Sequence, residues 1–164
     1  MNAIKIKEMK KDVVIFDLDG TLADIEARRT LATKENGKMD WGVFFDPDNI
    51  KLDLPNGPVI EMAKTLDAQG FRIVIFSGRS KATKEATADW LDKHNVPFNI
   101  MKMRPTGHPW AFMPDDKLKK SWLDDIFPGE QKDRILCVFD DRTKVVNMWR
   151  ENGLSCFQVA PGDF

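Results

Sequence analysis

The sequence has little of what a secreted or membrane-embedded protein needs. It holds only two cysteines in 164 residues. Both Cys137 and Cys156 sit inside apolar, strand-like runs, so we expect two reduced core thiols and no disulfide. No apolar run approaches the roughly 20 residues that span a bilayer, and the lysine-rich N-terminus lacks the apolar segment of a signal peptide. The sequence therefore predicts a cytoplasmic protein that does not contact a membrane.

A strong charge of one sign is also missing. The formal net charge is −1, with 31% charged and 42% hydrophobic residues. This balance argues against a surface coated by nucleic acid but leaves a local basic patch open. The two histidines, His94 and His108, have no partner at a zinc-ligand spacing. Because repeats, low-complexity tracts and linkers are absent too, we expect one domain over residues 1–164, in which residues 1–11 form a flexible or basic leader.

Short apolar runs alternate with segments of helical periodicity along the chain. This alternation is typical of a parallel sheet that is covered by helices on both faces, so we expect an α/β fold with a mostly parallel sheet of about five strands. Residues 24–57 are expected to start with a helix over 24–33 and to be irregular over 34–55. The other expected elements are strands over 13–16, 71–76, 98–103, 135–139 and 155–159, and helices over 58–69, 80–94, 115–126 and 143–152.

The most informative stretch is Val13–Leu22. Its first four residues are apolar and predict a buried strand, which two carboxylates follow at Asp17 and Asp19. Side chains at i and i+2 of an extended chain point to the same side, so both carboxylates can face one point. Gly20 allows a sharp turn, where Thr21 presents a hydroxyl. Like charges this close need a counter-ion, and a hard divalent cation such as Mg²⁺ suits oxygen ligands. An ordinary Asp-Gly turn after a strand is the alternative interpretation.

Two further polar clusters directly follow expected strands. Ser77–Arg79 follows one of them, and Asp140 with Asp141 follows another. The carboxyl ends of parallel strands share one edge of the sheet, where open α/β folds place their ligands. We therefore expect both clusters to meet the carboxylates of Asp17 and Asp19.

Such a set of groups can transfer a phosphoryl group between oxygen atoms. Asp17 could be the nucleophile that forms an aspartyl-phosphate, and Asp19 could act as general acid and then as base. Ser77 and nearby main-chain N–H groups could hold the phosphate oxygens. Asp140 could complete a metal shell that Asp141 supports. A lysine from the helix over 115–126 could neutralise charge, and the candidates are Lys117, Lys119 and Lys120.

The order of these motifs, Asp-x-Asp-Gly-Thr, Ser-Gly-Arg, a lysine and Asp-Asp, resembles the haloacid dehalogenase (HAD) superfamily of phosphohydrolases. Within it, the chain is similar to the 3′-phosphatase domain of phage-type polynucleotide kinase–phosphatases, and the similarity covers nearly the whole chain from Val13 onward. The resemblance implies a HAD-like three-layer sandwich and a Mg²⁺-dependent phosphatase. The runs that carry it are Ile75–Arg79, Asp115–Lys119, Phe139–Arg150 and Gln158–Phe164.

The resemblance also implies a role for each motif residue. Asp17 would be the nucleophile, Asp19 the acid–base, and Lys119 the motif lysine. Mg²⁺ would bind through the Asp17 carboxylate, the Asp19 main-chain carbonyl and Asp140, with Asp141 serving the same metal side. The residues expected to contact substrate are Thr21, Arg28, Arg29, Ser77, Gly78 and Arg79.

The substrate is predicted from what surrounds the site. This chain has no Gly-x₄-Gly-Lys-Ser/Thr loop, so the kinase half of the bifunctional enzymes is absent from it. The insertion over 24–57 is too short for a full cap domain, so we expect an open site, or one roofed by a second copy in a homo-oligomer. An open site suits a phosphorylated nucleic-acid end, and we predict removal of 3′-phosphates from DNA or RNA. In the 104–114 loop, Trp110 and Phe112 could stack on a base or simply pack.

Two other functions stay open. A nucleoside monophosphate phosphatase (nucleotidase) could use the same scaffold on a free nucleotide. A phosphate-binding protein or a receiver-like signalling module would need no catalysis. A receiver also carries acidic residues, a hydroxyl and a lysine on a parallel sheet, but in an order that differs from the Asp-x-Asp-Gly-Thr opening found here.

Overall fold

Five parallel strands form the centre of the protein, whose computed structural model describes residues 9–164. Most of the expected leader, residues 1–8, lies outside this described part. The spatial order of the strands is β5-β4-β1-β6-β7, and every neighbouring pair is parallel. The expected fold class is confirmed. The strands are β1 (Val13–Phe16), β4 (Arg72–Ser80), β5 (Ile100–Arg104), β6 (Ile135–Asp140) and β7 (Cys156–Gln158).

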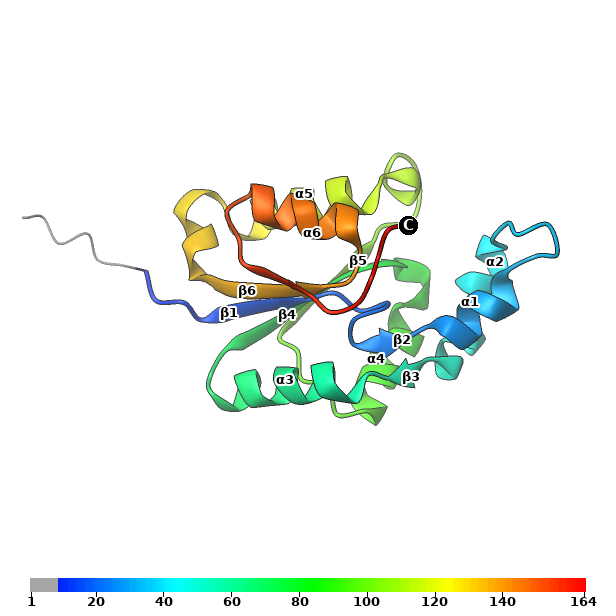
Figure 1. Ribbon diagram of the computed structural model, residues 1–164, viewed down its shortest axis with the longest axis horizontal. Helices are drawn as coiled ribbons and strands as arrows, with labels where there is room; N and C mark the ends of the chain where they lie inside the picture. Colours follow the sequence, from blue (N-terminus) through cyan, green and yellow to red (C-terminus); the bar gives the residue numbers. More distant parts are fainter. Residues whose placement is uncertain (1–8) are drawn as a thin grey trace, which may run out of the picture.

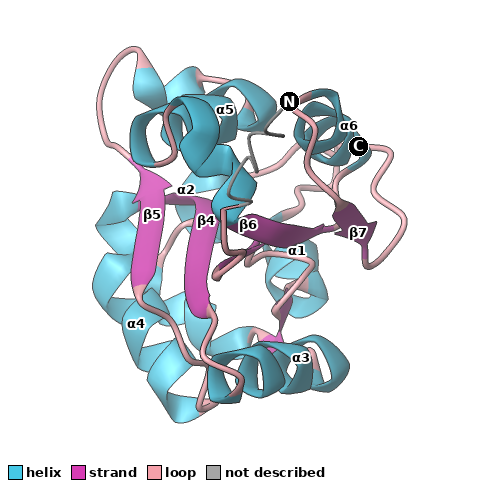
Figure 2. Ribbon diagram, turned by 90° about the vertical axis from the view of Figure 1, so that its left-hand side faces the viewer, coloured by secondary structure: helices cyan, strands magenta, loops and turns pink. Residues whose placement is uncertain are grey.

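Helices cover both faces of the sheet and complete the three expected layers (Figure 1). α5 (Asp115–Ile126) and α6 (Thr143–Glu151) lie on one face, and α3 (Gly57–Ala68) and α4 (Lys84–Lys93) lie on the other. Figure 2 views the molecule from the side, with β4 and β5 between the two helix layers. Within residues 9–164, no helix is long and apolar enough to cross a membrane.

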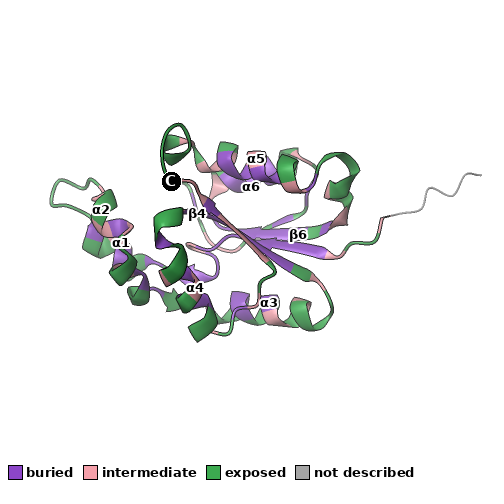
Figure 3. Cartoon of the chain, turned by 180° about the vertical axis from the view of Figure 1, so that it is seen from behind, coloured by how far each residue is buried: buried purple, intermediate pink, exposed green. Residues whose placement is uncertain are grey.

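The central strand β1 is buried on both faces because its side chains alternate between two cores. Val14 and Phe16 pack into the core on the side of α3 and α4. Val13 and Ile15 pack into the core on the side of α5 and α6. Each of the four is at most 1% exposed, and burying a side chain of this kind contributes about 1.5–3 kcal/mol. Figure 3 shows the buried strands between helices whose outer faces are exposed.

The segment between β1 and α3 lies beyond the carboxyl ends of the strands, at the right of Figure 1. Two short strands in it pair antiparallel with each other and stay separate from the main sheet. The segment therefore extends the molecule at the edge where the polar motifs were expected. Its elements are β2 (Ala23–Asp24), α1 (Glu26–Ala32), α2 (Trp41–Phe44) and β3 (Leu54–Pro55).

The expectation of an irregular chain over 34–55 is wrong in part, because α2 and a 3₁₀ helix over Pro47–Leu52 lie inside it. Each of these helices begins with an aspartate. Oδ1 of Asp40 accepts hydrogen bonds from the main-chain N–H groups of Gly42 and Val43, and Oδ1 of Asp46 accepts one from Asp48. Capping of this kind stabilises a helix start by about 1 kcal/mol.

β4 is longer than expected, since it continues past Phe76 through Ser80. Its pairing with β5 shifts register between Ser77 and Ser80. The helix expected from residue 80 therefore starts later, at Lys84. The Ser80 hydroxyl still caps, but it accepts the N–H of Ala82 in a 3₁₀ turn that precedes α4. As a result, the Ser-Gly-Arg motif lies inside a strand and not in the loop that follows it.

Strand order brings the three polar motifs together. β1 lies in the middle of the sheet, with β4 on one side and β6 on the other. The chain builds outward from β1 through β4 and β5, then crosses back to β6 on the opposite side. Ligands of open α/β sheets bind at the carboxyl ends of strands where the order reverses in this way.

Candidate active site

Three buried carboxylates form the centre of the site. Asp17 directly follows β1, Asp140 ends β6, and Asp141 is the next residue. One carboxylate oxygen from each lies within 4.8 Å of the others, and all three residues are at most 6% exposed. The expected meeting of the first and last acidic motifs is therefore seen in the structure.

One lysine lies among these carboxylates. Nζ of Lys119 donates to Oδ1 of Asp17 at 2.7 Å and to Oδ2 of Asp140 at 2.8 Å. Burial lowers the pKa of Lys119, but Asp140 and Asp17 outweigh burial and raise it overall, so the ammonium stays charged. Of the other candidates, Lys117 is exposed and Lys120 pairs with Asp124 on the surface.

A single lysine cannot neutralise three carboxylates. Burial is the largest cause that raises the pKa of Asp17, and the neighbouring Asp140 and Asp141 raise it further, although Lys119 opposes them. Burial and Asp140 likewise raise the pKa of Asp141. Three converging carboxylates with unneutralised charge are a donor set that fits a hard divalent cation. The residues present therefore fit the Mg²⁺ site predicted from the sequence.

Two neighbours fix the carboxylates in place. The hydroxyl of Thr21 donates to Oδ2 of Asp17 at 3.1 Å, and Nε1 of Trp149 donates to Oδ2 of Asp140 at 3.1 Å. Thr21 and Trp149 are both completely buried. Hydrogen bonds to carboxylates from rigid, buried donors hold their orientation.

Asp19 points away from the three carboxylates toward two arginines. Its Oδ1 accepts from Nη2 of Arg28 at 2.9 Å and from Nε of Arg79 at 2.7 Å. Burial raises the pKa of Asp19, but Arg79 and Arg28 outweigh it and hold that pKa below its ordinary value. Asp19 is therefore ionised in the free protein, the form that can accept a proton.

Both arginines are also bound to a second carboxylate. Asp53, just before β3, accepts from Nε of Arg28 at 2.8 Å and from Nη2 of Arg79 at 2.6 Å. The side chains of Asp53 and both arginines are 0% exposed. Asp53 and Asp19 thus hold the two guanidinium groups between them.

This arrangement differs from the predicted contact of Arg28 and Arg79 with substrate. Neither side chain lines the cavity described below, because each guanidinium is buried and occupied by Asp19 and Asp53. Thr21 and Ser77 are outside the lining as well. The Ser77 hydroxyl accepts the main-chain N–H of Arg79 at 3.2 Å. Of the residues expected to contact substrate, the structure places Arg29 and Gly78 on the cavity wall.

Gly20 is required by a close approach of the chain to the acidic cluster. Its φ is +83°, and a Cβ there would lie 2.2 Å from Oδ2 of Asp141. A side chain at this position would displace the Asp141 carboxylate, so the turn after Asp19 has room only for glycine.

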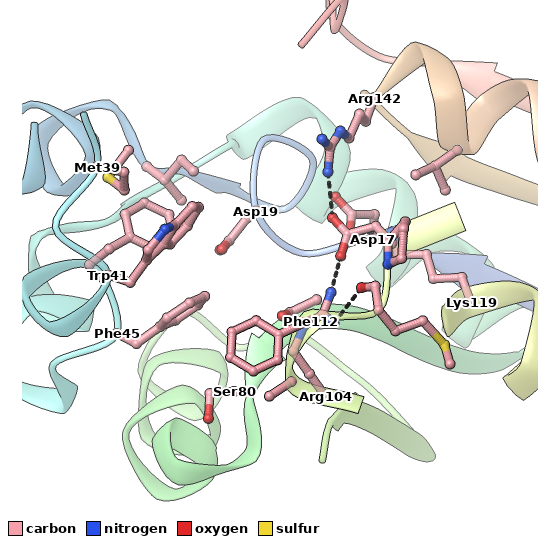
Figure 4. A pocket seen from close by; sticks show the side chains of 18 of the residues that line it. Asp17, Asp19, Met39, Trp41, Phe45, Ser80, Arg104, Phe112, Lys119 and Arg142 are labelled. Carbon is pink, nitrogen blue, oxygen red and sulfur yellow. Dashed lines mark hydrogen bonds and ion pairs between the residues drawn. The ribbon is translucent and has the colours of Figure 1, made fainter. Parts of the chain in front are cut away.

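A cavity of about 830 Å³ opens over the acidic cluster. Asp17, Asp140, Asp141 and Lys119 lie at one end. Figure 4 shows Met39, Trp41 and Phe45 on the side opposite Asp17, and Phe112 between them and Arg104. The walls thus come from the insertion and from the 104–114 loop. Of the two aromatic residues expected there, only Phe112 lines the cavity; Trp110 does not.

Two residues at the site were missed from the sequence. Asp53 stands in a stretch without helical or strand periodicity, and no signal marked it as the partner of two arginines. Trp149 belongs to the core, but nothing in the sequence analysis pointed to its contact with Asp140. A buried indole usually has an acceptor for its N–H, and that rule was the available signal.

Comparison with known proteins identifies the family. The sequence model of one protein family, the phosphatase domain of the polynucleotide kinase PNKP, matches residues 11–164. A curated protein of Autographa californica nuclear polyhedrosis virus, named "Putative bifunctional polynucleotide kinase/RNA ligase", is 31% identical over 141 residues, which are 84% of this chain and 18% of that protein. The chain therefore spans less than a fifth of this curated relative.

Solved structures agree on the fold. A chain in the structure of the Pnkp1/Rnl/Hen1 complex is 31% identical, with a TM-score of 0.74 over 94% of this chain and 48% of its own length. CbbY from Rhodobacter sphaeroides is 16% identical, with a TM-score of 0.61 over 93% of this chain and 87% of its own length, and supports the fold alone. The family match, which covers the three polar motifs and Lys119, means that this chain is a HAD-superfamily phosphatase and belongs to the family of polynucleotide kinase phosphatase domains.

Proposed function

We propose that the protein is a Mg²⁺-dependent phosphomonoesterase that works through an aspartyl-phosphate on Asp17 and removes 3′-phosphates from polynucleotide ends. The contact of Lys119 with both Asp17 and Asp140 carries this proposal. It holds a charged ammonium beside a buried carboxylate that lines the cavity. A carboxylate held in this way can attack phosphorus without being free to swing away.

The reaction would proceed in two displacements. A carboxylate oxygen of Asp17 forms a bond to phosphorus while the bond from phosphorus to the ester oxygen breaks. Asp19, which is ionised in the free protein, takes up a proton from the solvent when the substrate binds and gives it to the departing oxygen to make a hydroxyl. Water then attacks the phosphorus, Asp19 takes the proton of that water, and the bond to Asp17 breaks to release inorganic phosphate. The second step frees the Asp17 carboxylate, and Asp19 returns the proton of the water to the solvent, so the two steps together restore the starting state.

Metal binding would use groups that already converge. Asp17, Asp140 and Asp141 would hold Mg²⁺, together with the main-chain carbonyl of Asp19. The ion would supply positive charge to the phosphate oxygens. Lys119 would balance charge on the side of Asp17 and Asp140.

The remaining predicted residues divide by location. We assign Arg29 and Gly78, which line the cavity, to substrate contact. We assign Arg28 and Arg79 to positioning of Asp19, since they bind its carboxylate directly. Ser77 and Thr21 would stabilise groups next to the phosphate. The Ser77 hydroxyl accepts the main-chain N–H of Arg79, and the Thr21 hydroxyl donates to the carboxylate of Asp17.

A nucleic-acid end is favoured over a small molecule by the family and by the shape of the site. The viral relative is named as a polynucleotide kinase/RNA ligase, and a second similar structure is that of the Pnkp1/Rnl/Hen1 RNA repair complex. The insertion walls one side of the cavity and does not form a separate cap domain, so a strand can lead away from the phosphate. A single domain over 1–164, a cytoplasmic location and homo-oligomerisation remain predictions.

The decisive experiment compares two substrates at equal Mg²⁺. We expect a short 3′-phosphorylated oligonucleotide to be hydrolysed with a higher kcat/KM than any nucleoside 5′-monophosphate. If the kcat/KM for a 5′-mononucleotide is higher by tenfold or more, the proposed action on polynucleotides is wrong and the protein is a nucleotidase. Excess EDTA should abolish turnover of either substrate, and added Mg²⁺ should restore it. Full activity in EDTA would exclude the metal requirement.

A further inference from the structure

Two aromatic side chains of the cavity wall are largely exposed. Trp41 is 61% exposed and Phe112 is 85% exposed, and both line the cavity that contains Asp17. They come from two separate segments, the insertion and the 104–114 loop, and Figure 4 shows Phe45 between Trp41 and Phe112. Large aromatic surfaces left in water beside a site are typical of ligand contact.

Trp41 is held rigidly although it is exposed. Its ring stacks on Phe45 with 5.8 Å between centroids and 18° between planes, and meets the edge of Phe44 at 5.7 Å. Phe44 in turn lies 4.4 Å under the guanidinium of Arg28, whose Nη1 donates to the Phe44 carbonyl at 3.1 Å. The aromatic wall is therefore fixed to the same arginine that binds Asp19.

Phe112 is carried by a loop that is anchored on both sides of it. Nη1 of Arg104 donates to the carbonyls of Trp110 at 2.8 Å and Met113 at 2.6 Å. The Arg104 guanidinium also pairs with Asp115 at the start of α5. The main chain around Phe112 is thus fixed, while its ring is left free to contact a ligand.

The same cavity offers one basic group that is not occupied by a carboxylate. Arg29 makes no ion pair within residues 9–164, and its guanidinium lies 4.9 Å from the ring of Phe164. By contrast, Arg142 on the cavity wall pairs with Asp115. Arg29 is therefore available for a negative group that lies beyond the reacting phosphate.

We propose that Trp41 and Phe112 form a base-binding subsite for the nucleotide that carries the phosphate. This inference rests on the proposed function, and it adds that the terminal base must be unpaired. A terminal base that binds between Trp41 and Phe112 must first unstack from the neighbouring base pair. This costs the least free energy when the end of the strand is unpaired. Because every base has an aromatic face, the subsite selects single-stranded ends with little sequence preference. Arg29 then binds the next phosphate along the strand.

The test combines four variants with three substrates. The variants are Trp41→Ala, Phe112→Ala, Trp41→Phe and, as the matched control, Phe157→Ala, which removes an aromatic ring of similar exposure (58%) on β7, away from the cavity. The substrates are a single-stranded 3′-phosphorylated oligonucleotide, the same end in a blunt duplex, and a single strand whose 3′-phosphorylated terminal residue lacks its base. Circular dichroism verifies that each variant is folded.

We expect the wild type to prefer the single strand to the blunt duplex. Trp41→Ala and Phe112→Ala should each lower kcat/KM on the single strand by about 5- to 150-fold, the range for loss of one base stack. Both should stay within about twofold of the wild type on the base-free end. Trp41→Phe should recover most of the loss, and Phe157→Ala should match the wild type on all three substrates.

Two results would overturn the subsite while leaving the proposed function standing. One is that the wild type hydrolyses the single strand with the same kcat/KM whether or not its terminal residue carries a base. The other is an equal loss for Trp41→Ala and Phe112→Ala with and without that base, which would mean a general structural role. A wild type that hydrolyses a 5′-mononucleotide but none of the three 3′-phosphorylated ends would overturn the proposed function itself, and the subsite with it.

Discussion

Asp53 provides the sharpest test of how the site is held together. Its carboxylate accepts three hydrogen bonds from Arg28 and Arg79, and none of the three side chains is exposed. Burial raises the pKa of Asp53, and the two arginines lower it by less than burial raises it. The ion pairs themselves therefore add little net stability, since they roughly offset the cost of burying the charges.

Removing one partner is a different perturbation. Asp53→Asn keeps the size of the side chain but leaves Arg28 and Arg79 buried with one anion fewer. Loss of one partner from a buried pair typically costs about 3–5 kcal/mol. In a chain of this length, each kcal/mol lowers Tm by about 2–4 °C. We therefore expect Tm to fall by about 6–20 °C. We also expect a lower kcat at temperatures well below Tm, because the arginines that orient Asp19 are no longer fixed.

The measurement is thermal unfolding by circular dichroism together with steady-state kinetics at a temperature where both proteins are folded. Asp67→Asn is the matched control, because Asp67 is exposed on α3. Surface changes of this kind usually stay within about 0.5 kcal/mol. A Tm for Asp53→Asn within about 2 °C of the wild type, with unchanged kcat, would refute the reasoning.

Four further outcomes are expected. Asp17→Asn should keep the fold and lose nearly all turnover, and activity within tenfold of the wild type, with deamidation excluded, would contradict its role as nucleophile. Lys119→Ala should lower kcat far more than Lys117→Ala, since only Lys119 contacts Asp17 and Asp140; the reverse order would show that the wrong lysine was chosen. Trp149→Phe should lower kcat more than the control Trp122→Phe, because only Trp149 donates to Asp140, and equal effects would mean that packing alone matters. Burial raises the pKa of Cys137 to about 11 and of Cys156 to about 12, so iodoacetamide at pH 8 should label neither thiol in the folded protein and both in urea; rapid labelling of the native protein would contradict their burial.

The elements that could be predicted from the sequence are those whose signal is local. β1 and β6 are built on unbroken apolar runs that carboxylates follow directly, and α6 begins at its expected start, Thr143. Lys119 belongs to the buried face of α5 with Trp122 and Leu123, while Lys117 is exposed. Helical spacing therefore agrees with the lysine that the family resemblance selected.

The end of β4 shows why other boundaries could not be predicted. Its apolar pattern stops at Phe76, but the strand continues because Ser77 pairs with Met103 and Ser80 with Arg104 of β5. That pairing depends on a strand more than 20 residues away, and nothing in the local sequence marks it. The placement of Gly78 and Arg79 inside a strand is thus a consequence of tertiary structure.

The sequence predicted that Arg28 and Arg79 lie near the site and contact substrate, whereas in the structure both bind carboxylates of the protein. The reason is electrostatic. Every buried charged side chain within residues 9–164 belongs to this region: Asp17, Asp53, Asp140 and Asp141 on the acidic side, and Arg28, Arg79 and Lys119 on the basic side. Asp19, which is partly exposed, adds one more carboxylate. If all eight groups are ionised, two negative charges remain without a partner, and they fall in the cluster of Asp17, Asp140 and Asp141, because Asp19 and Asp53 are matched by two arginines. A divalent cation would supply that missing charge in the place where the proposed reaction needs it.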